Sequence, residues 1–133
     1  MNLRKSMRGY FRVAPLAAAS LLYIGMAHAA PAGDPGAGED VFASECSDCH
    51  SVRQGKNKKG PSLFGIVGRK SASIADFKYS DAMRALNTVW TVDKIETYIT
   101  KPKGMVPGGK MKYDGLANAK ARTDLLAYLA TKK

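Results

Sequence analysis

Apolar residues near the end of the chain recur every three to four positions, which is the spacing of a helix that buries one face. Ala121, Leu125, Tyr128 and Leu129 fall on that face, and the Asn118 side chain can cap the first turn. The pattern therefore predicts a C-terminal helix with one buried face.

Two shorter helices are predicted upstream from their capping residues. Ser80 can cap a helix that runs through Leu86. Thr91 can cap a helix over residues 92–100, which Pro102 would end.

A further helix is expected from about Gly38 to Cys46. Residues 39–45 contain neither Gly nor Pro, and their acids lie where the first turn of a helix favours negative charge. Residues 51–78 and 104–115 are rich in glycine, which is typical of loops. Because the chain shows little of the alternation typical of strands, we expect an all-α fold.

The N-terminal segment has the layout of an export signal. Four basic residues come first, followed by a mostly apolar run over residues 13–27. The basic residues are Arg4, Lys5, Arg8 and Arg12. Small side chains at Ala27 and Ala29 predict a secretory signal peptide over residues 1–29 and a periplasmic protein. The alternative is a retained anchor, but the apolar run has about fifteen residues and a bilayer needs roughly twenty.

The chain that remains after cleavage has about 104 residues, the size of one small domain. Residues 30–37 are rich in Pro, Gly and Ala, so we expect a flexible lead-in there. Residues 38–133 are then the domain.

A positive charge remains on this domain. The formal net charge of the whole chain is +10, and four of the 21 basic residues but none of the 11 acids lie in residues 1–29, so about +6 is left. Export excludes nucleic acid as a partner and leaves an acidic protein or an anionic membrane surface. Eight lysines are spread over loops and turns, where they form either a solvated surface or a ring that steers docking. They are Lys56, Lys58, Lys59, Lys70, Lys101, Lys103, Lys110 and Lys112.

The strongest chemical signal is the run from Cys46 to His50. Cys46 and Cys49 are the only cysteines in the chain, and His50 follows directly. On a helix, residues three and four apart share a face, so both thiols and the imidazole can meet one side of a flat macrocycle. The spacing predicts c-type haem attachment, with a thioether bond from each cysteine and His50 as an iron ligand.

Three other interpretations of the two cysteines are open. A redox dithiol would need a strand and a parallel sheet around it. A structural zinc site needs four ligands, and the only other histidine is His28 in the predicted signal peptide. A disulfide between residues three apart would close a very small loop and stabilise little.

A methionine is the expected second axial ligand of the iron, because no second histidine remains after signal removal. Met83 falls on a predicted helix, where the usual role is core packing. Met105 also lies at a helix end. Met111 lies in a Gly-rich loop that can carry its thioether over the haem, so we expect Met111, with Met105, Met83 or an open position as alternatives.

Several separated motifs occur in one order and together resemble class I cytochrome c, in particular the short mitochondrial-like bacterial members called cytochrome c2 or c-550. The resemblance runs from about Gly38 to Lys132. The motifs are Gly38-x-x-x-Phe42-x-x-x-Cys46-x-x-Cys49-His50, Lys59-Gly60-Pro61-Ser62-Leu63-x-Gly65-x-x-Gly68-Arg69, Phe77-x-Tyr79-Ser80-Asp81-Ala82, Trp90, Lys101-Pro102-x-x-x-x-Pro107-Gly108-x-Lys110-Met111-x-Tyr113-x-Gly115 and Asp124-Leu125-x-Ala127-Tyr128-Leu129.

The resemblance implies roles for five further residues. The Pro61 carbonyl would accept a hydrogen bond from the His50 ring, which fixes the orientation of an axial ligand. Three side chains would hold a buried haem propionate and one would lie near the methionine sulfur. They are Arg69, Tyr79 and Trp90 for the propionate, and Tyr98 for the sulfur.

The resemblance also implies a function. It describes a monomeric carrier, not an enzyme, with one haem c in an all-α fold, which moves single electrons between a quinol-oxidising cytochrome bc1-type complex and a terminal oxidase or photosynthetic reaction centre. The alternatives are an enzyme or gas sensor with an open sixth position, and a fixed subunit of a membrane complex.

The chain departs from the family pattern at four positions near the haem. Gly109 stands where a threonine is usual and Met83 where an asparagine is frequent. Glu45 replaces a common lysine, and Tyr113 replaces a usual phenylalanine. These changes predict a different hydrogen-bond network and different partner contacts.

Overall fold

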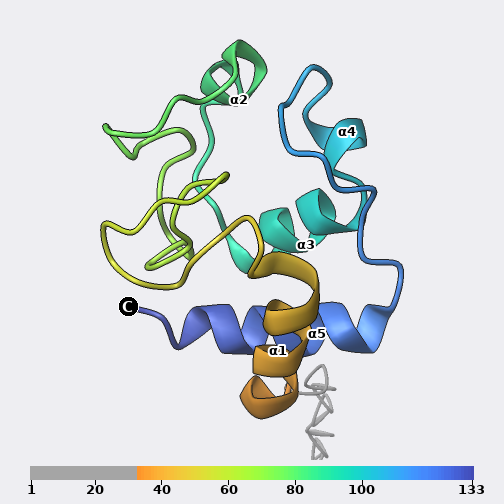
Figure 1. Ribbon diagram of the computed structural model, residues 1–133. Helices are drawn as coiled ribbons and strands as arrows, with labels where there is room; N and C mark the ends of the chain where they lie inside the picture. Colours follow the sequence, from red (N-terminus) through yellow and green to blue (C-terminus); the bar gives the residue numbers. More distant parts are fainter. Residues whose placement is uncertain (1–32) are drawn as a thin grey trace, which may run out of the picture.

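The fold is all-α, as predicted. The structure is a computed structural model that describes residues 33–133, and within this range it contains no strand. An isolated antiparallel bridge joins Lys70 and Val89. The helical elements are α1 (Pro35–Val41), the single π-helical turn η1 (Phe42–Cys46), α2 (Asp81–Ala85), α3 (Val92–Thr100), α4 (Pro102–Met105) and α5 (Ala119–Ala130) (Figure 1).

Three helices begin at the capping residues that the sequence predicts. The Ser80 hydroxyl accepts a hydrogen bond from the Met83 backbone N–H at 3.1 Å, at the start of α2. Thr91 caps α3 in the same way at 3.3 Å. The Asn118 side chain accepts from the Ala121 N–H at 3.1 Å, at the start of α5. Each cap satisfies a backbone donor that the helix itself leaves free.

The start of α1 corrects the prediction of a helix from Gly38 and of a lead-in that extends to residue 37. The helix begins at Pro35, because Asp34 caps it by accepting from the Gly36 N–H at 2.8 Å. A proline in the first helical turn loses no hydrogen bond. The predicted signal peptide, residues 1–29, lies outside the described residues.

A second contact fixes this early start. The Asp34 N–H donates to the Asp124 carboxylate at 2.8 Å, and Lys120 pairs with the same carboxylate at 2.7 Å. The Lys120 ammonium, followed by the Asp34 N–H, holds the pKa of the buried Asp124 below its usual range. Asp124 therefore ties the N-terminal end of the domain to α5.

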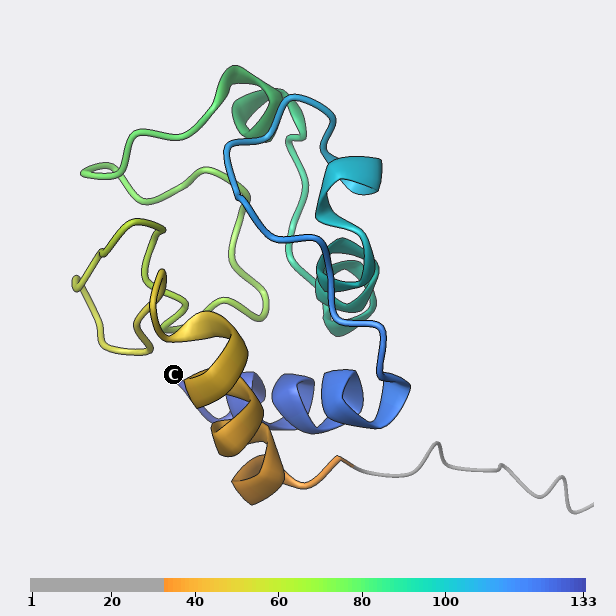
Figure 2. The same cartoon turned by 45° about the vertical axis from the view of Figure 1, so that its right-hand side comes forward.

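Helices α1 and α5 cross at close range (Figures 1 and 2). A Cβ atom on Gly38 would lie 2.0 Å from the Asp124 carbonyl oxygen, so only glycine permits this approach. Farther along the contact, the Phe42 and Tyr128 rings pack with centroids 5.7 Å apart. Leu125, 2% exposed, is the most buried side chain of the core.

Helix α4 was not predicted. Pro102 ends α3, as expected, but then occupies the first turn of α4, whose last two residues fall in the 104–115 segment predicted to be loop. Val106, which follows α4, is buried, so this turn is fixed by packing. None of the helices in residues 33–133 combines the length and apolar composition needed to cross a bilayer.

The remaining segments form two sides above α1 and α5. In Figure 2, residues 51–80 lie on one side, and α3, α4 and the 106–118 loop lie on the other. Helix α2 connects the two sides at the end opposite α5. This arrangement holds the functional residues apart, around the cavity described next.

Candidate functional site

One cavity of about 410 Å³ brings together every site residue predicted from the sequence. These are Cys46, Cys49, His50, Pro61, Arg69, Tyr79, Trp90, Tyr98 and Met111. Much of the remaining lining is apolar and includes Leu63, Ile66, Ile95, Ile99, Leu116, Leu125 and Leu129. Of the three candidate methionines, Met83 also lines the cavity and Met105 does not.

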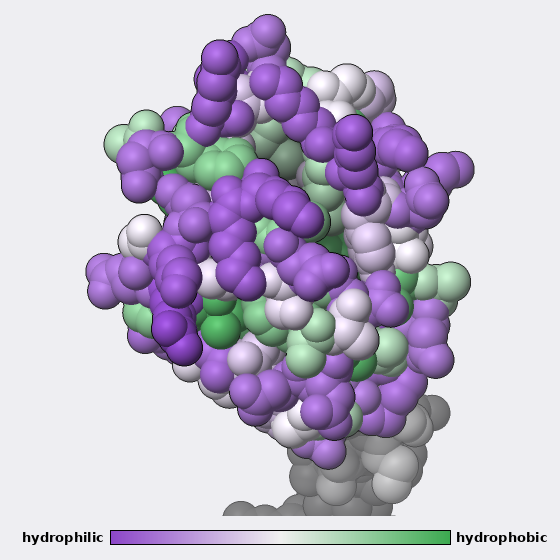
Figure 3. All heavy atoms as spheres, in the orientation of Figure 1, coloured by the Kyte–Doolittle hydropathy of each residue, from purple (hydrophilic) through white to green (hydrophobic). Residues whose placement is uncertain are grey.

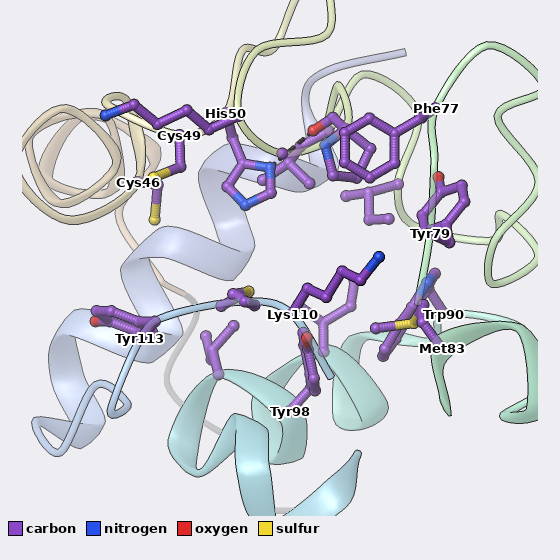
Figure 4. A pocket seen from close by; sticks show the side chains of 18 of the residues that line it. Cys46, Cys49, His50, Phe77, Tyr79, Met83, Trp90, Tyr98, Lys110 and Tyr113 are labelled. Atoms are coloured by element: carbon purple, nitrogen blue, oxygen red, sulfur yellow. Dashed lines mark hydrogen bonds between the residues drawn. The ribbon is translucent and has the colours of Figure 1, made fainter. Parts of the chain in front are cut away.

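The cysteines lie where η1 passes into a turn. The Cys49 and His50 N–H groups both donate to the Cys46 carbonyl oxygen, at 3.1 and 2.9 Å. These hydrogen bonds keep Cys46, Cys49 and His50 in the helical arrangement predicted from their spacing. The turn η1 that precedes them is a π-helix, which is wider than the predicted α-helix. Figure 4 shows both cysteines beside the His50 ring, at one end of the cavity.

The chemistry of the cysteines disfavours a redox dithiol. Both thiols are free. Burial, with smaller contributions from Glu45 and Cys49, raises the pKa of Cys46 to about 11. Reactive dithiols need the opposite shift, toward thiolate. Within residues 33–133, no group of three or more His, Cys, Asp or Glu side chains is arranged to hold a metal ion.

The His50 ring is held in its neutral form. Its Nδ1 lies 2.7 Å from the Pro61 carbonyl oxygen, and because a carbonyl only accepts, Nδ1 must carry the proton. The lone pair is therefore on Nε2. Burial lowers the pKa of His50, opposed by the Pro61 hydrogen bond, so the ring is neutral at pH 7. The ring projects into the cavity (Figure 4).

Gly60 supports the His50 ring, a role that sequence reasoning missed. A Cβ atom on Gly60 would lie 2.3 Å from the ring Cε1. The Gly60 N–H donates to the Cys49 carbonyl oxygen at 2.7 Å, which holds this backbone against the attachment turn. The glycine could be seen in the Lys59-Gly60-Pro61 motif, but its contact with the ring depends on the tertiary fold.

The 106–118 loop forms the opposite wall. Lys110 and Tyr113, which flank Met111 in this loop, lie across the cavity from His50 together with Tyr98 (Figure 4). Gly115 (φ 121°) lets the loop return beside α3, where a Cβ atom would lie 2.1 Å from the Thr100 carbonyl oxygen. The loop thus carries Met111 over the side of the cavity that faces the histidine.

A polar corner contains a positive charge without a protein counter-ion. The Arg69 guanidinium donates to the carbonyl oxygens of Phe64 at 2.7 Å and Ser62 at 2.8 Å. Among residues 33–133, no carboxylate pairs with it. Tyr79 and Trp90 lie beside each other at the same end of the cavity (Figure 4). A half-buried cation with only neutral partners favours an anionic group in this corner.

The cavity therefore fits a haem. Haem is flat and apolar over most of its surface, and it carries two acidic propionates. The apolar walls match the apolar surface of the haem, and Arg69, which pairs with no carboxylate of residues 33–133, matches a propionate. The two thiols and the neutral imidazole are the groups that attach a c-type haem and bind its iron.

Charged side chains surround the mouth of the cavity. Five exposed lysines line it: Lys59, Lys70, Lys78, Lys110 and Lys112. Lys78 was not among the eight lysines singled out from the sequence. In Figure 3, hydrophilic residues cover most of the visible face, and hydrophobic atoms show in the hollows between them.

One acid contributes to the same rim. The Tyr113 hydroxyl donates to the Glu45 carboxylate at 2.9 Å. Burial, and after it Glu45, raises the pKa of this hydroxyl, so it stays protonated and remains a donor.

The part of the chain that matches known proteins includes every residue of the site. Residues 36–133 match the family model described as Cytochrome c. A cytochrome c2 from Rhodopila globiformis is 44% identical over 104 residues, covering 78% of this chain and 98% of that protein. A cytochrome c from Guizotia abyssinica is 42% identical over 101 residues, covering 75% of this chain and 91% of that protein. A cytochrome c-type cyt cy from Rhodobacter capsulatus is 41% identical over 109 residues, covering 82% of this chain and 54% of that protein.

Proposed function

The chain belongs to the cytochrome c family of electron carriers, and we propose that it works in the periplasm as a soluble carrier of single electrons, with its iron held between His50 and Met111. Its cofactor is one haem c, bound covalently through Cys46 and Cys49. The observation that carries the proposal is the single cavity in which the cysteine turn and His50 face the Met111 loop.

The haem supplies the redox chemistry, because its iron accepts and releases one electron. His50 binds through Nε2, and the hydrogen bond from Nδ1 to Pro61 fixes the plane of its ring. The Met111 thioether is a soft ligand that favours the reduced state and raises the potential. The apolar walls would exclude water from a bound haem, so little solvent would need to rearrange when the iron gains or loses its electron.

The polar corner holds the acidic edge of the haem in this proposal. Arg69 balances a propionate charge, and the Tyr79 hydroxyl and the Trp90 indole N–H supply donors. Tyr98 lines the cavity on the same side as Lys110 of the 106–118 loop (Figure 4), in keeping with a donor near the Met111 sulfur. If His50 and Met111 both bound the iron, the chain would leave no coordination position for a substrate, which supports a carrier without enzymatic activity.

The rim supports docking to acidic partners. Five exposed lysines around the cavity mouth would steer the haem edge toward a negatively charged surface. We propose a cytochrome bc1-type complex as the electron donor and a terminal oxidase or photosynthetic reaction centre as the acceptor. Recovery in a periplasmic extract, with Ala30 as the first residue, would support a soluble carrier, whereas retention in the membrane would indicate a fixed subunit.

The absorption spectrum of the purified, oxidised haem protein tests the ligand pair. We expect a low-spin spectrum with a sulfur-to-iron charge-transfer band near its red end. A high-spin spectrum, together with ready binding of carbon monoxide after reduction, would contradict the proposal and indicate an enzyme or gas sensor with an open sixth position.

A further inference from the structure

The Tyr113–Glu45 hydrogen bond joins the two walls of the haem cavity. Tyr113 lies two residues after Met111 in the 106–118 loop, and Glu45 lies in η1 directly before Cys46. The two residues are 68 positions apart in the sequence, and both line the cavity. The bond therefore connects the segment that carries the proposed sixth ligand with the turn that carries the haem attachment.

The loop makes few other hydrogen bonds that could hold Met111 in place. The Gly109 N–H donates to the Val106 carbonyl oxygen at 3.0 Å, and the Leu116 N–H donates to the Ile99 carbonyl oxygen at 2.8 Å. Between these two anchors, the backbone of residues 110–115 makes no hydrogen bond within the described part of the chain.

Besides the Tyr113–Glu45 bond, the side chains of residues 110–115 make one ion pair within the described part of the chain. Asp114 pairs with Lys103 at 3.1 Å, but Lys103 belongs to α4, on the same side of the cavity as the loop. Gly109 has no side chain that could bond. Tyr113 thus supplies the one hydrogen bond that holds residues 110–115 toward the opposite wall within residues 33–133.

We propose that Glu45 and Tyr113 are positioning residues that hold the Met111 segment closed over the haem and keep the sulfur on the iron. The inference rests on the proposed role of Met111 as the sixth ligand. Glu45 and Tyr113 are also two of the four positions at which the sequence departs from the family pattern. A lysine and a phenylalanine could not form this bond, because neither side chain offers an acceptor.

The size of the effect follows from the kind of bond. A hydrogen bond to a carboxylate is stronger than a neutral one, but Glu45 is exposed to solvent, so its net contribution is reduced. An external ligand such as imidazole binds the iron only when the sulfur has left it. Its apparent affinity therefore rises in proportion to the open population.

The experiment measures imidazole binding to the oxidised haem protein by absorption, at one pH, for the unsubstituted protein, Tyr113→Phe, Glu45→Ala and the double variant. Each single substitution should raise the imidazole affinity about three- to tenfold. The double variant should bind imidazole no more tightly than the tighter single variant, because the same bond is already lost. Unchanged affinities, or effects that multiply in the double variant, would overturn the inference.

A second Tyr–Glu pair provides the control. The Tyr128 hydroxyl donates to the Glu39 carboxylate at 3.4 Å and ties α5 to α1, away from the loop. Tyr128→Phe should lower resistance to urea but leave imidazole affinity within about twofold of the original. If Tyr128→Phe raised imidazole affinity as much as Tyr113→Phe does, the Tyr113 effect would reflect general destabilisation, and the inference would be wrong.

The charge-transfer band of the unsubstituted protein separates this inference from the proposed function. Without the band, Met111 is not the ligand, and both fail. With the band present in the unsubstituted protein and lost in Met111→Ala, but no coupling between Glu45 and Tyr113, the ligand assignment stands and only the positioning role is rejected.

Discussion

At the scale of single residues, the two walls of the cavity hold their proposed iron ligands with different firmness. One wall supplies the two cysteines and His50, whose ring is confined between the Pro61 carbonyl and the Gly60 backbone. The other wall supplies Met111 from a loop with sparse hydrogen bonding. Contacts within the protein thus fix the orientation of the His50 ring, whereas the position of the Met111 sulfur depends on the conformation of a loop.

Replacing the methionine tests that asymmetry. Met111→Ala should leave the haem attached, because Cys46 and Cys49 are unchanged, and should open the sixth position. The charge-transfer band should disappear and the potential should fall by roughly 0.2 V, a fraction of the about 0.8 V over which axial ligands set haem potentials. A spectroelectrochemical titration measures both quantities.

Two other methionines serve as controls. Met105→Ala should keep the band, because Met105 packs against the core and does not line the cavity. Met83 does line it, so Met83→Ala is the stricter comparison. Loss of the band in Met83→Ala, with the band retained in Met111→Ala, would assign the iron to Met83 instead.

The site residues could be predicted from the sequence because they either lie close together in it or belong to family motifs. Cys46, Cys49 and His50 lie within five positions, so their spacing alone indicates the cofactor. The role of Gly60 could not be derived in this way, since a glycine carries no chemistry until the ring it supports has been placed. The Tyr113–Glu45 bond was likewise hidden, because both residues could be seen as departures but not as neighbours.

At the scale of helices, local signals located α2, α3 and α5, and distant contacts decided the rest. Each of these three helices begins at a side chain that caps a backbone donor three positions later. Helix α1 begins at Pro35 because Asp34 caps it and also contacts Asp124, 90 positions away. The Asp34-Pro35 pair is a start signal in the adjacent sequence, but neither the contact with Asp124 nor the packing that fixes α4 leaves one.

The crossing of α1 and α5 depends on Gly38. In Gly38→Ala, the added Cβ would lie 2.0 Å from the Asp124 carbonyl oxygen and 2.8 Å from the Tyr128 Cβ, so the helices must separate. Overpacking of this kind costs about 1–3 kcal/mol, and we expect a loss of about 3 kcal/mol because the nearest atom is backbone. Urea unfolding of the haem protein measures the change.

Gly36→Ala is the matched control, because it makes the same substitution in the same helix. Among residues 33–133, the one atom that the added Cβ would approach is Oδ1 of Asp34, at 3.3 Å. Alanine favours a helix over glycine by about 1 kcal/mol, so this variant should be as stable as the original protein or slightly more so. Equal losses in the two variants would show that helix packing at Gly38 is not the cause.

At the scale of the whole molecule, a largely apolar cavity and a charged rim are combined above helices α1 and α5. Helices α1 and α5 form its base, and the loops and α3 supply walls that come from distant parts of the sequence. The sequence indicated the basic character but not its distribution, since the positions of the lysines around the cavity depend on how the two sides fold. The exposed rim contains five lysines and Glu45, which leaves it strongly positive.

That rim predicts a salt-dependent reaction with acidic partners. In a kinetic assay with membranes that contain the oxidase or reaction centre, the second-order rate constant should fall on the order of tenfold as ionic strength rises from about 0.01 M to 0.15 M.

Lys78→Gln and Lys112→Gln should each lower the low-salt rate about two- to threefold and leave the high-salt rate nearly unchanged, because they alter steering and not the haem. Lys133→Gln removes the same charge from an exposed position that does not line the cavity, so its effect should be smaller. If Lys133→Gln slowed the reaction as much as the rim variants do, net charge alone would govern the encounter. A rate that does not respond to salt would exclude electrostatic docking through this face.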